Sequence, residues 1–226
     1  MGTRITSLAN NFDSTGKLKA AGINNASLSG ITALPSSANA GKMTLLSTQT
    51  ASSSSSLSFV NGSNGVVLDS TYKVYKFVFK NIHSSATGAN ALFQFQGSIN
   101  TGSSYGVAIT STAFWAYHSE ADATAFSYDV NDDLAQSTSY QNLSNRNHND
   151  NDSNMSGELW LYNPSSTTYV KHFMATTNNM HPQPMSLNER IGGYFNTTSG
   201  IDAIDFKFNT GTIDDGTISL YGVSTS

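Results

Sequence analysis

Residues 145–154 form a run dominated by Asn and Asp, whose side-chain oxygens are ligands that calcium prefers. Their spacing matches the first three ligand positions of a calcium-binding loop, at Asp150, Asp152 and Asn154. The match ends there, because Met155 stands where the sharp turn requires Gly and Leu161 stands where a bidentate Glu is needed. A solvated loop is the favoured interpretation, an irregular calcium site is the alternative, and we predict no metal site.

The chain lacks the usual signatures of catalysis. Its five His residues show neither an HExxH motif nor a short His-x-His spacing, and because Ser is abundant, chance combinations of Ser, His and Asp are uninformative. No GxGxxG or GxxxxGK[ST] loop occurs either, so we expect no cofactor. Paired carboxylates for glycoside hydrolysis are poorly supported, because Glu occurs only at Glu120, Glu158 and Glu189. We predict a non-enzymatic protein, with a glycan depolymerase that uses Glu158 and an aspartate as a remote alternative.

An aromatic cluster at residues 114–117 is the remaining candidate for binding. In a strand, Trp115 and Tyr117 would share one face and Phe114 the other. An aromatic ring can cover the C–H face of a sugar, but packing in a core or at a subunit interface is the favoured interpretation. Trp115 and Tyr117 are therefore the candidate ligand or interface aromatics.

Composition limits the partners that the chain can bind. The 226 residues are 38% hydrophobic and only 12% charged, with a formal net charge of −4 and no Cys. The acidic balance argues against a nucleic-acid partner, because phosphate binding requires clustered Lys and Arg. No apolar stretch approaches the length of a membrane span, so we expect no membrane insertion.

From residue 43 onward, short runs rich in β-branched and aromatic residues alternate with Gly, Asn, Asp and Ser, which is typical of an all-β domain. Alternation in the run at 72–80 places Tyr75, Phe77 and Phe79 on one inward face. About ten strands predict an antiparallel, two-sheet, jelly-roll-like sandwich. Asp214-Asp215-Gly216 predicts a hairpin turn between the last two strands. The expected strands are 43–50, 57–60, 72–80, 91–99, 105–117, 157–162, 168–175, 190–196, 201–209 and 217–223.

Residues 1–41 lack a sustained period of 2 or 3.6 and contain single apolar residues spaced among small ones. Such a segment can be ordered by lying in a groove of another protein, and a disordered tail is the alternative. We therefore divide the chain into an extended N-terminal docking arm and hinge, 1–41, and a β-sandwich domain, 42–226. The candidate docking residues of the arm are Ile5, Leu8, Phe12, Leu18, Ile23, Leu28, Ile31 and Leu34.

Several segments of the sandwich region resemble a β-sandwich module of phage tail and virion structural proteins, notably of marine phages. The resemblance extends over roughly residues 43–223 and concerns structural motifs only. The segments are LLSTQT at 45–50, VYKF at 74–77, NPSSTTYVKHF at 163–173, GGY at 192–194, IDAIDF at 201–206 and GTISLYG at 216–222.

The resemblance implies a virion structural protein at the particle surface, attached to other virion proteins through the N-terminal arm. It implies a homo-oligomer, with a trimer favoured, and no catalytic residue. Because the chain has no fibre shaft, we expect a compact head or tail appendage, such as a capsid decoration, rather than a long tail fibre. The alternative is a receptor-binding or glycan-binding adhesin domain of a tail fibre or spike, which would attach the phage to a host-surface glycan.

Overall fold

The computed structural model describes residues 42–86 and 91–224, which form twelve β-strands and no helix. No helix in this part of the chain is therefore long and apolar enough to span a membrane. The strands are β1 Met43–Thr50, β2 Leu57–Val60, β3 Val74–Ser84, β4 Ala91–Ser98, β5 Ile109–Ser119, β6 Thr124–Tyr128, β7 Gln141–Asn147, β8 Met155–Tyr162, β9 Lys171–His181, β10 Met185–Phe195, β11 Ala203–Phe208 and β12 Ile213–Val223.

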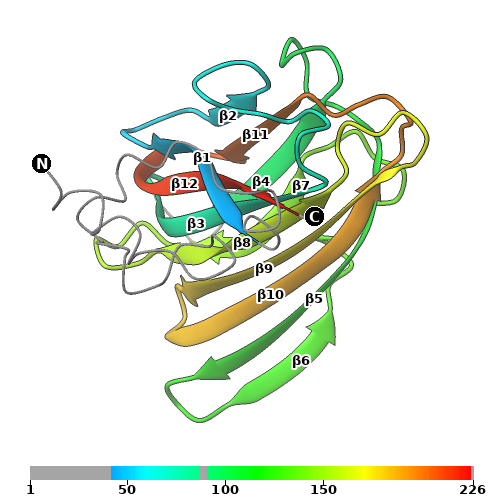
Figure 1. Cartoon of the computed structure of the whole chain (residues 1–226). Helices are drawn as coiled ribbons and strands as arrows, with labels where there is room; N and C mark the ends of the chain where they lie inside the picture. The colour runs from blue at the N-terminus through cyan, green and yellow to red at the C-terminus, as the bar shows by residue number, and fades with distance from the viewer. Residues whose placement is uncertain (1–41, 87–90, 225–226) are drawn as a thin grey trace, which may run out of the picture. The chain divides into compact units, whose positions relative to one another are not determined.

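The strands form two antiparallel sheets of unequal width, packed as a sandwich. The larger sheet has the order β1-β12-β3-β8-β9-β10-β5-β6, and the smaller has the order β2-β11-β4-β7. In Figure 1 the strands β10, β5 and β6 form one end of the large sheet, away from β2 and β11. The predicted all-β, two-sheet sandwich is confirmed. The predicted arm, residues 1–41, lies outside the described residues.

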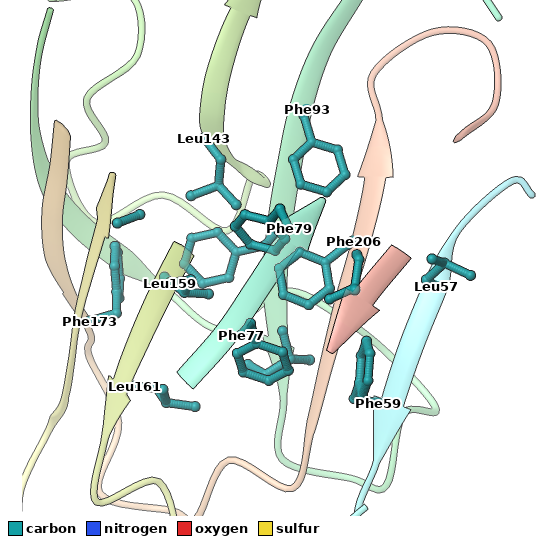
Figure 2. Packing of buried hydrophobic residues seen from close by; sticks show 14 of the residues in the cluster. Leu57, Phe59, Phe77, Phe79, Phe93, Leu143, Leu159, Leu161, Phe173 and Phe206 are labelled. Carbon is teal, nitrogen blue, oxygen red and sulfur yellow. The ribbon is translucent and has the colours of Figure 1, made fainter. Parts of the chain in front are cut away.

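Phenylalanine is the most frequent residue type of the core and comes from both sheets. Tyr75, Phe77 and Phe79 of β3 are at most 2% exposed, which confirms the inward face predicted from their alternation. Phe206 of β11 lies opposite them, with its ring centroid 5.1 Å from that of Phe77 and 5.3 Å from that of Phe79. Figure 2 shows these rings meeting between the sheets together with Phe93 of β4. Edge-to-face contacts of this kind add to the stabilisation that burial provides.

Two strands, β6 and β7, lie where the sequence pattern predicted none. β6 is a five-residue edge strand that is mostly exposed, so burial imposes no alternation on its sequence. β7 reads QNLSNRN and includes Asn145 to Asn147, which were expected to lie in a loop. The Asn147 side chain is buried, and its Nδ2 donates hydrogen bonds to the Ala91 carbonyl and to Ser144 Oγ. Buried amides whose Nδ2 groups are paired in this way replace the apolar residues that would have indicated a strand.

The predicted hairpin between the last two strands is wrong. β11 belongs to the small sheet and β12 to the large one, and Asp214-Asp215-Gly216 lies inside β12. The pairing of β12 with β3 shifts register at these residues, and Gly216 has a φ of 115°. A Cβ there would lie 2.5 Å from the Asn81 carbonyl oxygen. Positive φ at an Asp-Gly pair thus serves a β-bulge instead of a turn.

Candidate functional site

Along β5, the side chains of the inner face change from buried to partly exposed. Ile109 and Ala113 are buried in the hydrophobic core, whereas Trp115 and Tyr117 are partly exposed and lie outside it. Alternation places all four side chains on the same face of the large sheet. The edge strand of the small sheet, β7, contacts β9 and β10, while β5 and β6 lie further out. Trp115 and Tyr117 therefore occupy a part of the inner face that the small sheet leaves accessible.

Trp115 and Tyr117 stack on each other and line a cleft. Their ring centroids are 5.7 Å apart and the ring planes are inclined by 27°. The cleft has a volume of about 370 Å³, which is within the usual range for small-molecule sites. Its lining residues are Trp115, Tyr117, Ser127, Tyr128, Asp129, Val130, Asn131, Asn145, Arg146, His181, Gln183, Met185 and Leu187.

A second, more open depression of about 530 Å³ adjoins this cleft. The two share Tyr117, Gln183 and Met185 and thus form one continuous surface around the β9–β10 turn. A ligand longer than a single small ring can therefore extend from the stacked aromatic pair toward Glu120 and Pro184.

Two buried polar residues that line the cleft, Asp129 and His181, are held in place by hydrogen bonds to backbone groups. Asp129 donates its N–H to the Ala113 carbonyl and accepts the Asn131 N–H at Oδ1, which ties residues 129–131 to β5. His181 Nδ1 accepts the Gln183 N–H, so the neutral ring carries its proton on Nε2. Burial, followed by the charge of Arg146, lowers the pKa of His181. The imidazole is therefore neutral at pH 7 and can donate a hydrogen bond.

Arg146 reaches the cleft from a bulge in β7. Between Phe93 and Ala91 of β4, the pairing on β7 runs from Ser144 to Asn147, so β7 contains one extra residue. Arg146 lies within this bulge with a φ of 52°, a left-handed conformation that is uncommon for a residue other than Gly. Bulges re-aim side chains at the rims of sheets and next to functional sites.

Two buried carboxyl groups hold the base of this bulge. Glu189 Oε2 accepts the N–H of Asn145 at 2.8 Å, and Asp132 Oδ2 accepts Asn145 Nδ2–H at 3.1 Å. Asn179 Nδ2 donates to the Asn145 carbonyl at 2.9 Å. Burial raises the pKa of Glu189 to about 8, with a smaller opposing effect from the Asn145 N–H. Glu189 is thus protonated at pH 7, and the network positions Asn145 beside Arg146.

The Asn- and Asp-rich run is divided by the structure. Residues 145–147 end β7, whereas Asp150 and Asp152 lie exposed in the connection to β8. Within residues 42–86 and 91–224, no group of three or more His, Asp or Glu residues is arranged to hold a metal ion.

Glu158, the carboxylate of the remote depolymerase alternative, lies on the other face of the large sheet. It alternates with the buried Leu159 on β8 and forms an ion pair of 2.5 Å with Lys76. Trp160 Nε1–H donates to its second carboxylate oxygen at 2.8 Å. Although partial burial acts in the opposite direction, these contacts lower the pKa of Glu158. Glu158 is therefore an ionised, structurally paired carboxylate, separated from the cleft by the sheet.

The structure brings together residues that the sequence did not connect. Trp115 and Tyr117 were candidates, and Arg146 belonged to the polar run. His181 was considered only as one of five His residues without zinc-ligand spacing, and Gln183 and Asp129 were not considered. No local spacing relates these positions, because they come from β5, β7, the β9–β10 turn and the segment after β6. The eight apolar residues proposed for the arm, Ile5 to Leu34, lie outside the described residues.

The fold and the site define a two-sheet β-sandwich with an aromatic cleft on the inner face of its wider sheet. Comparison with protein-family models, curated proteins and solved structures gives no match. The function is therefore inferred from the chemistry of the cleft itself.

Proposed function

We propose that the β-sandwich is a saccharide-binding adhesin module. The observation that supports this most directly is the stacked pair of Trp115 and Tyr117, which presents aromatic surface in an open cleft. The C–H face of a pyranose packs well on such surface, while amide and imidazole groups at the rim match its hydroxyls. Because Trp115 and Tyr117 project from a strand rather than a loop, little conformational entropy is lost when a ligand binds.

We further propose that the chain is a short head or tail appendage of a phage virion and displays this module at the particle surface. The support for this context is the resemblance of residues 43–223 to virion modules and the spaced apolar residues of the segment 1–41. A homo-oligomer, with a trimer favoured, is part of the same proposal. Light scattering of the purified chain measures that state directly.

Replacing Trp115 with Ala is expected to weaken saccharide binding at least about 30-fold, because loss of a central aromatic anchor typically costs 2 kcal/mol or more. The measurement is saturation binding of the purified protein to oligosaccharides prepared from the surface of susceptible host cells. The matched control is Trp160→Phe, since Trp160 lies on the opposite face, beside Lys76. With Trp160 replaced, quenching of Trp115 fluorescence also reports binding directly. Unchanged affinity in Trp115→Ala would refute the assignment of the cleft.

Deleting residues 1–41 is expected to leave a folded sandwich that binds saccharide but no longer joins virions. The reason is that the core and the cleft are built from residues 51–220. Circular dichroism and saccharide binding test the domain, and incorporation into particles lacking the wild-type protein tests attachment. Normal incorporation of the truncated chain would contradict the docking role of the arm.

A further inference from the structure

Arg146 also lines the cleft, but the stacking of a sugar on Trp115 and Tyr117 does not require its positive charge. Among the described residues that line the cleft, Arg146 is the permanent cation, because His181 is neutral at pH 7 and none of the others is Lys. Within residues 42–86 and 91–224, its guanidinium forms no ion pair and no side-chain hydrogen bond. Five N–H donors are therefore available at the rim of the site.

The neighbouring carboxyl groups do not neutralise this charge by direct contact. Asp129 also lines the cleft, but its Oδ1 accepts both the N–H and the Nδ2–H of Asn131. Glu189, behind the cleft, is protonated at pH 7 and accepts from Asn145. Glu189 and Asp132 thereby hold the residue adjacent to Arg146 without pairing with the guanidinium itself.

The backbone at Arg146 is also unfavourable for its residue type. A non-Gly residue at φ 52° in a strand costs free energy, which the hydrogen bonds around Asn145 offset. The consequence of this bulge is that an unpaired guanidinium lines the same cleft as Trp115 and Tyr117. A guanidinium forms its strongest and most directional contacts with a planar carboxylate, which it can bind through two parallel hydrogen bonds.

We propose that the cleft selects saccharides bearing a carboxylate, such as uronic acids or sialic acids, and that Arg146 binds the carboxylate while Trp115 and Tyr117 stack on the ring. This inference rests on the proposed saccharide-binding function and specifies its ligand class. The carboxylate of an acidic sugar would supply the ion-pair partner that Arg146 lacks among the described residues. The stacked pair supplies affinity that neutral sugars would share.

The test is binding to a glycan array that contains matched acidic and neutral members: galacturonate oligosaccharides with their methyl esters, sialylated glycans with their desialylated forms, and sulfated analogues. Wild-type protein is expected to bind acidic members at least tenfold more tightly than their neutral partners. Arg146→Gln is expected to lose about ten- to a hundredfold of affinity for carboxylated glycans and to lower the affinity for their neutral partners much less, so that the ratio of acidic to neutral affinity falls. Arg146→Lys should recover only part of this loss, because Lys lacks the planar fork.

Arg190→Gln is the matched control. Arg190 is exposed and alternates with the buried Glu189 and Ile191 on β10, so its removal changes net charge equally on the opposite face. An equal effect of Arg146→Gln and Arg190→Gln would show nonspecific attraction and overturn the inference. Equal binding of acidic and neutral partners, or a preference for sulfated over carboxylated glycans, would overturn it as well. If acid selectivity is absent but Trp115→Ala still abolishes binding, only this inference fails. If wild-type protein binds no glycan, the proposed function fails too.

Discussion

Replacing Phe206 with Ala is expected to lower the free energy of unfolding by about 3–5 kcal/mol. Phe206 is fully buried, and its ring contacts aromatic rings from both sheets. The loss combines the transfer free energy of the ring with a cavity that the surrounding rings cannot fill without moving. The five aromatic partners are Phe59, Phe77, Phe79, Phe93 and Phe95, with centroid distances from 5.1 to 6.3 Å.

Guanidinium chloride unfolding, followed by circular dichroism, measures this change. The control is Phe126→Ala, which makes the same chemical change on β6, where Phe126 is 71% exposed and contacts Phe114. That variant is expected to lose less than about 1 kcal/mol, because surface substitutions rarely cost more. Similar losses at the two positions would contradict the arrangement of the core.

Replacing Glu189 with Gln is expected to remove a pH dependence from the stability of the sandwich. Folding raises the pKa of Glu189 from its ordinary value of 4.5 to about 8, mainly through burial. The folded state therefore binds the proton more tightly than the unfolded state does. Below pH 4.5 both states are protonated and the penalty is absent. Between pH 4.5 and 8 the wild type loses stability as pH rises, by up to about 5 kcal/mol.

Gln at position 189 keeps an acceptor for the Asn145 N–H and cannot ionise, so wild type and variant should be similarly stable near pH 4.5. The variant should become progressively more stable than the wild type up to pH 8. Unfolding curves at intervals between these values measure the difference. Glu120→Gln, at an exposed position, is the control and should show no such trend. A constant difference between Glu189→Gln and wild type across this range would contradict a protonated Glu189.

The sequence predicted best those strands whose burial alternates. The ranges 43–50 and 57–60 agree with β1 and β2, and the face of Tyr75, Phe77 and Phe79 is the one that packs inward. Alternation succeeds there because one side of each strand must contact the opposite sheet. The same reasoning failed at residues 141–147, where buried amides bond to neighbouring backbone groups instead of packing as apolar side chains.

The candidate site was only partly visible in the sequence. Trp115 and Tyr117 were expected to share a face, and they stack on each other. Whether that face was core or cleft could not be predicted, because it depends on how far the small sheet extends across the large one. Arg146 was visible as one basic residue in a polar run, but its direction results from a bulge whose register is set by β4.

The all-β class, the phenylalanine-rich inner faces and the low fraction of charged residues could be predicted without the structure, because each follows from local alternation and composition. Tertiary structure decided which strands share a sheet, as the separation of β11 from β12 shows. It also decided that Trp115, Arg146 and His181 line one cleft. These residues are distant along the chain. The pairing of β10 with β5 and β9, and the packing of β7 against β9 and β10, place them together, a long-range outcome that no local pattern specifies.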